Sequence, residues 1–360
     1  MASTIYEIAS RAGVSKSTVA RVLRGELKES SPRIAERADR IRQLARELNY
    51  RPNWRARAFS NQKTNGIGLL YAQSHVVFRG VMSEVAEAFD VALRKKGYHL
   101  VMVPCGDGNE SWRNLVLGGA VDGIAMLFEA PRASLEAIAE SGLPAVLMGD
   151  RLDKSAAEID APEVTMNDYQ GSYTATKHLT DLGHRDIVML FYEYERDHYS
   201  VAERRAGFDD ALSDAGIDSD ARFLTHMKAE YAEPILSRPS LPSAVVCYSH
   251  FEALAVTQGL WAHDLRVPED VSVVGFNDLV ATRFLTPPLT TVAFDTRAIG
   301  RIGAELLVKQ IEGDDPAAMA DVVMPEQLVV RSSTGPPRQT EPVWSRRSRR
   351  PKPYPEPDGE

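Results

Sequence analysis

The chain has 360 residues, of which 44% are hydrophobic and 26% charged, as in ordinary globular proteins. A chain of this length exceeds one small domain and suits two or three packed units. No apolar run approaches the length of a membrane-spanning helix, and no apolar signal core follows the N-terminus. These features argue against a membrane or exported protein, and we expect a cytoplasmic one.

The net charge of −8 is unevenly distributed along the chain. Residues 1–60 contain 13 Lys and Arg against 6 Asp and Glu, a net charge of +7, and the remaining residues carry −15. A basic N-terminal segment on an acidic body favours a nucleic-acid contact confined to one end. A solvated charged surface would produce the same pattern.

The first 25 residues predict two short helices joined by a tight turn. Apolar residues recur at helical spacing on either side of the turn. These are Ile5, Ile8, Ala9, Val19, Val22 and Leu23. Gly13 occupies the place of a left-handed helix end, and Ser15 can cap the second helix. The segment therefore predicts a helix-turn-helix.

The outward face of the second predicted helix carries polar side chains suited to DNA. They are Lys16, Ser17, Thr18 and Arg21. If this helix lies in a major groove, such side chains can hydrogen-bond base edges and phosphates. Lys16, like the nearby Arg24, is equally compatible with a solvated charge.

Residues 9–23 carry the pattern A-x-x-A-G-V-S-x-x-T-V-x-R-V-L. Through it, the segment resembles the helix-turn-helix headpiece of the LacI/GalR family of bacterial transcription regulators. The resemblance implies that Lys16 and Ser17 read bases and that Arg21 makes a bidentate contact to a guanine edge. It also implies that five residues contact DNA phosphates and so fix the position of the headpiece along the duplex: Thr4, Tyr6, Ser15, Thr18 and Asn53.

A third helix over residues 28–48 completes the predicted headpiece, residues 1–48, and a linker over residues 49–61 follows. Residues 50–59 resemble the family's hinge pattern Y-x-P-N-x-x-A-R-x-L, with Phe59 in place of the leucine. In the family this hinge helix pairs with its twin in a dimer and enters the minor groove. The resemblance therefore places Ala56, Arg57 and Phe59 at the DNA, where Phe59 would wedge into a base step. A hydrophobic contact between headpiece and body is the alternative role for Phe59.

From residue 66 onward, short apolar runs alternate with amphipathic stretches. The apolar runs predict strands buried on both faces, at residues 67–71, 100–103, 123–128, 145–148, 187–191, 244–247 and 271–276. Helices are predicted between them, at residues 81–96, 172–182, 203–215 and 251–263. This alternation, extended to roughly ten strands, predicts an α/β body of two parallel-sheet subdomains with ligands at the carboxyl ends of the strands.

The family resemblance continues through the body to about residue 335, with matching motifs at residues 178–187, 204–208, 267–278 and 286–292. It implies a periplasmic-binding-protein-like domain for effector binding and dimerisation over residues 62–335. One subdomain would comprise residues 62–162 with 293–322. The other would comprise residues 163–292 with 323–335.

Four residues are implied as effector contacts by their places in the resemblance: Phe78, Arg204, Ser249 and Asn277. Arg204 matches an arginine that reaches the effector, and the amide of Asn277 offers donors and an acceptor at a strand's carboxyl end. A surface salt bridge for Arg204 and a loop cap for Asn277 are the alternatives. Two departures appear, because Ser249-His250 replaces Asn-Asp and only Phe78 remains of Asn-Pro-Phe-Phe.

Two further segments leave alternatives open. Residues 192–199 form an aromatic and charged loop, compatible with a sugar, a cationic or a heterocyclic effector, or with an ordinary solvent loop. The tail, residues 336–360, contains seven prolines and a basic cluster at residues 346–350, and it is predicted to be disordered. That cluster suits either loose phosphate contacts or a solubilising role alone.

The sequence contains no pattern typical of catalysis or cofactor binding. The eight histidines lack metal-ligand spacing, and neither a nucleophile elbow nor a phosphate-binding loop is present. Cys105 and Cys247 lie in apolar runs and are expected as buried thiols in a reducing compartment rather than a disulfide. We therefore expect neither an enzyme, a metal site nor a cofactor.

Together, the basic N-terminal segment and the helix-turn-helix predict a sequence-specific DNA-binding transcriptional regulator. The resemblance implies a repressor that binds a palindromic operator as a homodimer. The resemblance implies allosteric control by a small-molecule effector, a sugar or related metabolite, between the two subdomains. Whether the effector induces or co-represses stays open. A solute-binding protein of periplasmic type would need an export signal and no headpiece, and an α/β enzyme would need a catalytic constellation.

Overall fold

The computed structural model describes residues 4–23, 27, 31–50, 63–72, 80–105, 111–128, 132–149, 159–192, 198–218, 222–226, 232–315 and 319–340. The chain separates into two units, Met1–Asn65 and Gly66–Glu360. Each unit has its own apolar interior.

The first unit contains three helices in its described residues: α1 (Ile5–Ala12), α2 (Lys16–Leu23) and α3 (Pro32–Glu47). Their apolar stripes meet in one core around Ile8, Val19 and Ile41. Gly13 ends α1 with a φ of +63°, and its amide donates to the carbonyls of Ala9 and Ser10. This left-handed residue reverses the chain tightly enough to pack α2 against α1, as the sequence predicts. The first residues expected for the third helix, 28–30, lie outside the described residues.

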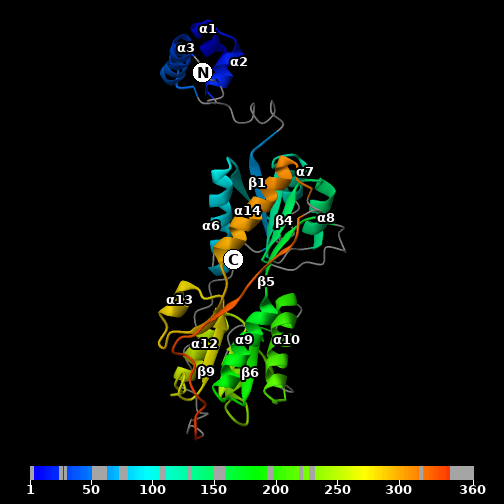
Figure 1. Ribbon diagram of the computed structural model, residues 1–360, viewed down its shortest axis with the longest axis vertical. Helices are drawn as coiled ribbons and strands as arrows, with labels where there is room; N and C mark the ends of the chain where they lie inside the picture. The colour runs from blue at the N-terminus through cyan, green and yellow to red at the C-terminus, as the bar shows by residue number, and fades with distance from the viewer. Residues whose placement is uncertain are drawn as a thin grey trace. The chain divides into compact units, whose positions relative to one another are not determined.

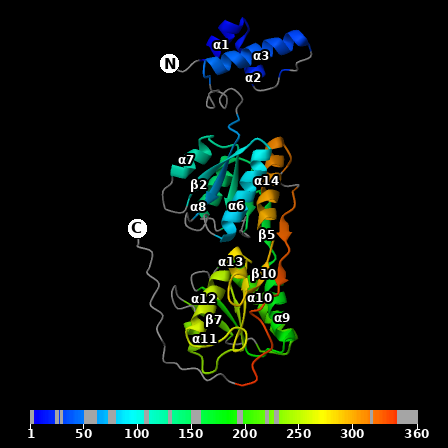
Figure 2. The same cartoon turned by 90° about the vertical axis from the view of Figure 1, so that its left-hand side faces the viewer.

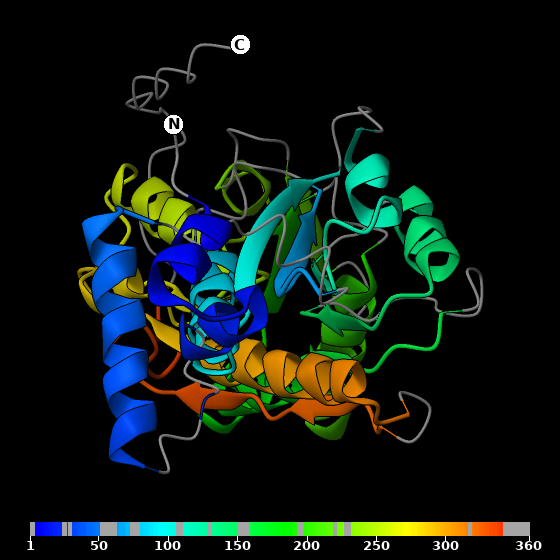
Figure 3. The same cartoon turned by 90° about the horizontal axis from the view of Figure 1, so that it is seen from above.

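The second unit contains two six-stranded sheets (Figure 1). The first sheet has the order β11-β5-β4-β3-β1-β2, and all its strand pairs are parallel. Its strands are β1 (Gly66–Tyr71), β2 (His99–Pro104), β3 (Gly123–Leu127), β4 (Ala145–Met148), β5 (Glu163–Met166) and β11 (Val322–Met324). One face packs on α6 (Gly80–Lys95) and α14 (Thr296–Glu312), and the other on α7 (Ser111–Leu117) and α8 (Arg132–Ser141). Figures 2 and 3 show α7 and α8 on the opposite side of this sheet from α14.

The second sheet has the order β12-β10-β9-β8-β6-β7, and only β12 runs antiparallel to its neighbour. Its strands are β6 (Ile187–Tyr192), β7 (Phe223–His226), β8 (Ala244–Cys247), β9 (Ser272–Phe276), β10 (Thr290–Ala293) and β12 (Gln327–Val329). One face packs on α9 (Asp168–Asp181) and α10 (Tyr199–Asp214). The other packs on α11 (Glu233–Leu236) and α12 (His250–Trp261), and the short α13 (Val280–Arg283) follows β9.

The predicted elements need three corrections. Residues 100–103 form part of β2, the edge strand of the first sheet, so Leu100, Val101 and Met102 are only half-buried rather than buried on both faces. α9 begins at Asp168 rather than residue 172, because the side chain of Asn167 caps it. α10 begins at Tyr199 rather than residue 203. In both helices the first turn is polar or mixed and shows no apolar periodicity.

Glycine allows one helix of each subdomain to approach its neighbour closely. A Cβ placed on Gly207 of α10 would lie 2.2 Å from the carbonyl oxygen of Tyr169 in α9. A Cβ placed on Gly300 of α14 would lie 2.2 Å from the carbonyl oxygen of Val85 in α6. Both contacts are with rigid backbone, so any larger residue would push these helix pairs apart.

The chain crosses between the two sheets three times. It crosses from β5 to α9, from β10 to α14, and between β11 and β12. The crossings run side by side, because the amide of Asn167 donates to the carbonyl of Met324 over 3.0 Å and Ala293 pairs with Gln327. The division expected at 162/163 falls just before β5, whose pairing with β4 keeps residues 163–166 in the first sheet.

The start of the predicted tail is packed on the body. Residues 336–340 are described, and the guanidinium of Arg338 donates to the carbonyls of Pro242 and Asp270, each over 2.9 Å. The prediction of disorder is therefore wrong for residues 336–340. Arg338 holds this segment against the end of the second sheet, because its guanidinium donates hydrogen bonds to backbone carbonyls there. Residues 341–360, with the basic cluster, lie outside the described part.

Cys105 and Cys247 are both buried thiols that form no disulfide, as predicted. Burial raises the pKa of Cys247 well above its ordinary value, and the nearby Glu252 adds to the effect. The thiol is therefore a packing group rather than a nucleophile. Among the described residues, no helix combines the length and apolar character that crossing a membrane requires.

Candidate DNA-reading surface and effector site

The outward face of α2 carries the side chains predicted to read DNA. Lys16, Ser17 and Arg21 are exposed, whereas Thr18 is half-buried. The hydroxyl of Ser15 accepts from the amide of Thr18 over 3.2 Å and lies 2.8 Å from the hydroxyl of Ser17. Ser15 thus fixes the start of the helix, as its sequence position predicts.

Tyr6 and Lys16 support each other on this face. The ammonium group of Lys16 donates to the Tyr6 hydroxyl over 3.2 Å and lies 5.0 Å from the centre of its ring. Tyr6 is 65% exposed, and Thr4 is exposed at the N-cap of α1. The exposed polar groups from α1 and α2 therefore form one surface, which suits phosphate and base contacts.

Several predicted site residues cannot be placed. Asn53, Ala56, Arg57 and Phe59 lie outside the described residues, and so does Phe78. Residues 193–197 of the aromatic loop are likewise outside them.

Arg204 is the centre of the second candidate site. Its Nε donates to Oδ1 of Asp168 over 2.7 Å, and the two side chains are only 5% and 0% exposed. A second guanidinium nitrogen donates to the carbonyl of Tyr248. The guanidinium carbon lies 4.6 Å from the centre of the Tyr248 ring and 4.0 Å from that of Phe276. Arg204 is therefore a buried, stacked cation and not a surface salt-bridge residue.

The electrostatics of this pair favour the charged forms. Burial by itself lowers the pKa of Arg204, but the charge of Asp168 outweighs it and the pKa lies above its ordinary value. The hydroxyl of Tyr199 also donates to Asp168, over 3.1 Å. Two donors from α10 thus hold the Asp168 carboxylate at the N-terminal end of α9, where the helix dipole also favours negative charge.

These residues gather at the carboxyl ends of the second sheet's strands. Tyr248 directly follows β8, Phe276 ends β9, and Asn277 comes next. Asn277 has a φ of +83° and is half-buried, and its amide donates to the carbonyl of Val292 over 2.8 Å. Parallel α/β sheets bind ligands at this edge. The structure therefore brings Arg204 and Asn277 to the same edge, as the sequence predicts.

The structure places Ser249, the third predicted effector contact, at the N-cap of α12. Its hydroxyl accepts from the amide of Phe251 over 3.1 Å and donates to the carboxylate of Glu252. Glu252 also accepts from the amide of Ser249 over 2.9 Å, which completes a capping box at the start of α12. The Ser249 hydroxyl is thus engaged in holding its own helix.

The carboxyl-end loops of the second sheet touch the first subdomain near the start of α6. A Cβ placed on Gly80 would lie 3.1 Å from a methyl group of Leu279 and 3.9 Å from Cε1 of His250. His250 is buried, and burial lowers its pKa to about 4 while Glu252 opposes the shift. At neutral pH its imidazole is uncharged.

Sequence reasoning missed Asp168 and Tyr248. Asp168 lies 36 residues from Arg204 and follows the four-residue β5, which begins with a glutamate and therefore does not appear as an apolar run. The polar pair after that strand, Asn167-Asp168, is the one local signal. Tyr248 contacts Arg204 partly through its backbone carbonyl, which any residue would supply.

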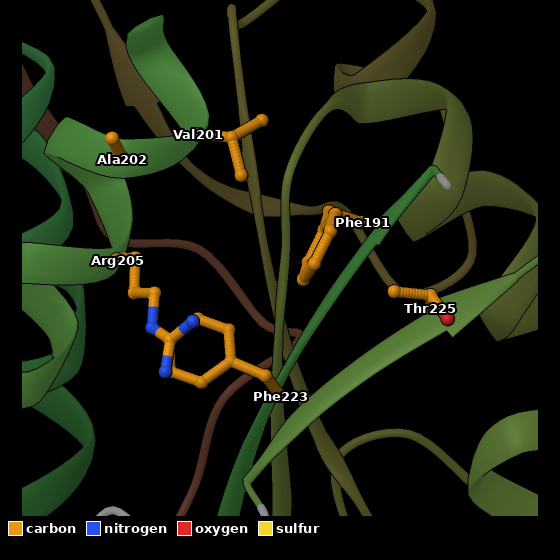
Figure 4. Close-up of a pocket in the computed structure, with 6 residues that line it drawn as sticks. All are labelled: Phe191, Val201, Ala202, Arg205, Phe223 and Thr225. Atoms are coloured by element: carbon orange, nitrogen blue, oxygen red, sulfur yellow. The ribbon is translucent and has the colours of Figure 1, made fainter. Parts of the chain in front are cut away.

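A cavity of about 500 Å³ lies beside α10, at the edge of the second sheet (Figure 4). It is lined by Phe191, Val201, Ala202, Arg205, Phe223 and Thr225. The guanidinium carbon of Arg205 lies 4.2 Å from the centre of the Phe223 ring, and Figure 4 shows the two groups overlapping. Arg205, which lines this cavity, directly follows Arg204 in the chain. None of the four predicted effector contacts lines the cavity.

Comparison with known proteins assigns the family. Residues 4–53 match "Bacterial regulatory proteins, lacI family", and residues 176–334 match "Periplasmic binding protein-like domain". The HTH-type transcriptional repressor PurR of Pasteurella multocida is 30% identical over 342 residues, which cover 92% of this chain and 98% of that protein. The chain belongs to the lacI family of bacterial regulatory proteins. The Ribose operon repressor of Haemophilus influenzae is 29% identical over 320 residues, covering 86% of this chain and 92% of that protein.

Solved structures of lacI-family proteins share the architecture. The transcriptional regulator CelR in complex with cellobiose is 27% identical, with a TM-score of 0.68 over 92% of this chain and 99% of that one. The Lac repressor dimer bound to operator and the anti-inducer ONPF has a TM-score of 0.77 over 93% of this chain and 100% of that one, at 24% identity. The predicted fold class is thus confirmed. As a lacI-family member the protein is a DNA-binding transcriptional regulator and not an enzyme.

Proposed function

We propose that this lacI-family regulator is a homodimeric repressor that binds a palindromic operator in the cytoplasm. The observation that carries this proposal is the exposed polar face of α2, with Lys16, Ser17 and Arg21 together on a capped, well-packed helix. A recognition helix of this kind reads base edges in the major groove, while Thr4, Tyr6 and Ser15 hold phosphates. The Lac repressor structure, a dimer bound to its operator, supports the assembly.

The hinge residues complete the proposed DNA contact. Asn53, Ala56, Arg57 and Phe59 would form a short helix that orders against its twin and the minor groove. Phe59 would insert into the central base step, and the resulting bend would favour the paired headpieces.

The second copy is proposed to pack on an apolar surface around α12 and α13. Phe251, Val280 and Phe284 are 54%, 61% and 81% exposed there. Large side chains left in water in one region favour association with a complementary surface. In a two-fold dimer the same surface of both copies would meet, which buries all three side chains.

The effector is proposed to bind beside Arg204 and Asn277, at the carboxyl ends of β8 and β9. Arg204 is held by Asp168 and lies against two aromatic rings, so its remaining donors have a fixed direction. A sugar or a related metabolite with several hydrogen-bonding groups fits such donors and the Asn277 amide. The cellobiose complex of CelR and the ribose-bound lacI-family regulator of Enterococcus faecium support this ligand class.

Control would follow from differential binding. The effector can alter operator affinity only by binding one arrangement of the two subdomains more tightly than another. The three crossing segments would transmit that difference toward the N-terminal side of the body and so to the hinge helices.

A gel-shift assay tests the proposed function. The full-length protein is titrated against DNA from upstream of its own gene at moderate salt, alone and with ribose, cellobiose or other candidate metabolites. We expect binding at nanomolar protein, a change with one ligand, and a loss of affinity and bending in Phe59→Ala. Absence of DNA binding, also to fragments selected from genomic DNA, would contradict the proposal.

A further inference from the structure

Glu326 occupies the third crossing between the subdomains. It lies between β11 of the first sheet and β12 of the second. This crossing is bonded to the other two, through the amide of Asn167 at Met324 and the pairing of Ala293 with Gln327. The backbone on both sides of Glu326 is therefore bonded to the other two crossings.

The side chain of Glu326 is buried in an unusual way. It is 7% exposed, and neither carboxyl oxygen has a hydrogen-bond partner among the described residues. It fills the space that Gly171 of α9 leaves open, since a Cβ at Gly171 would lie 1.8 Å from Oε2. The same Cβ would lie 3.0 Å from Val292 of β10. A buried carboxyl group without partners is costly, which makes a purely structural role a poor explanation.

The charges that face Glu326 come from the proposed effector site. α9 contributes Asp168 and α10 contributes Arg204, whereas β10 and β12 contain no charged residue. Two carboxyl groups thus compete for one guanidinium, whose Nε already bonds Asp168. Burial raises the pKa of Glu326 to about 8, with Arg204 opposing and Asp168 adding to the shift. At neutral pH the neutral acid leaves the Arg204–Asp168 pair intact.

We propose that Glu326 is a positioning residue that couples the Arg204–Asp168 pair to the crossing segments. While its carboxyl group is neutral, the Glu326 side chain stays against Gly171 and the two sheets keep the arrangement seen in this structure. When the carboxyl group loses its proton, the charged side chain moves out of the space beside Gly171, toward Arg204 or into water. The crossing segments rotate with it. Where this inference concerns effector control, it rests on the proposed function, because a ligand at Arg204 would then change the proton affinity of Glu326 and the reverse.

The test measures the distance between the subdomains without DNA or effector. Spin labels are attached at Lys96→Cys, beyond α6, and at Ser213→Cys, near the end of α10, both of which are exposed. The native Cys105 and Cys247 are buried and do not compete for the label. Distance distributions are recorded by double electron–electron resonance from about pH 6 to about pH 9.5.

We expect the distribution of the labelled parent to shift in a single-proton transition with its midpoint near pH 8. Glu326→Gln should keep the low-pH distribution throughout. Gly171→Ala, which removes the space for the carboxyl group, should displace the distribution already at low pH. Glu84→Gln is the matched control, since Glu84 accepts from Thr296 at another crossing over 2.6 Å and should leave the midpoint unchanged.

Two results would overturn the inference. One is a parent distribution that does not move across this pH range. The other is the same pH-dependent shift in Glu326→Gln as in the parent. Because the experiment contains neither operator nor ligand, either result leaves the proposed repressor function standing, and failure of DNA binding leaves this inference standing.

Discussion

Substitution of Asp168 by asparagine tests the electrostatic centre of the body. Asp168→Asn keeps the shape of the side chain but leaves the Arg204 charge without its 2.7 Å partner, in a place where the two side chains are 0% and 5% exposed. Removing one partner of a buried ion pair costs about 3–5 kcal/mol. We therefore expect the free energy of unfolding of the body to fall by about 3 kcal/mol or more at neutral pH.

Glu326 modifies this expectation. Its carboxyl group faces the same guanidinium, and without Asp168 it becomes the remaining acid that can pair with Arg204. Asp168→Asn combined with Glu326→Gln should therefore lose more stability than the two single substitutions added together. The excess is a coupling free energy of the kind that a double-mutant cycle isolates.

The assay is urea unfolding followed by far-ultraviolet circular dichroism, with the free energy obtained by linear extrapolation. Asp181→Asn is the matched control on the same helix, because Asp181 pairs with Lys177 over 2.7 Å but the two side chains are 62% and 52% exposed. Such a pair contributes about 0.2–1 kcal/mol. Equal losses for Asp168→Asn and Asp181→Asn would refute the view that Arg204 depends on a buried partner.

Three further predictions concern DNA reading, assembly and pH. Arg21→Ala should weaken operator binding by about 1–3 kcal/mol in a gel-shift titration and relax specificity at one base pair, whereas Arg37→Ala on the exposed side of α3 should not alter which base is read. Phe284→Asp should convert the dimer to monomers in sedimentation velocity, because it places a charge on a side chain that is 81% exposed on the proposed contact surface; a persistent dimer would locate the interface elsewhere. His178 and His184 have pKa values lowered by burial, so the unfolded chain binds more protons and stability should fall as the pH drops below about 6.5. His184→Gln should flatten that loss, and an unchanged pH profile would contradict it.

Local sequence determined the headpiece. Its helices, the left-handed Gly13 and the Ser15 cap all lie within about twenty consecutive residues, so the pattern contains nearly every contact that the turn needs. The long buried strands of the body were predictable for the same reason, since they are continuous apolar runs. The strands that sequence reasoning missed have three or four residues: β5, β7, β10, β11 and β12. Four of these strands contain polar residues and β11 has only three residues, so none is a continuous apolar run of the kind that revealed the four-residue β4 and β8.

The proposed effector site contains contacts that no local sequence pattern predicts. The family resemblance drew attention to Arg204, but its partner Asp168 and the carbonyl of Tyr248 come from distant segments. Ser249 shows the opposite case, because its hydroxyl completes a capping box with Glu252 and so serves the helix. Glu326 gave no signal in the sequence, since an isolated glutamate is usually exposed.

The sequence by itself determined the two kinds of domain, the polar outward face of α2 and the family to which the chain belongs. Those properties reside in contiguous patterns, where neighbours in the chain are also neighbours in space. Only the tertiary structure decided that Arg204 is a buried cation held by Asp168, and that Glu326 lies at a crossing between the sheets without a hydrogen-bond partner among the described residues. Pairing of this kind depends on which distant segments packing brings together and on how much water it removes, and neither quantity can be read from the order of residues.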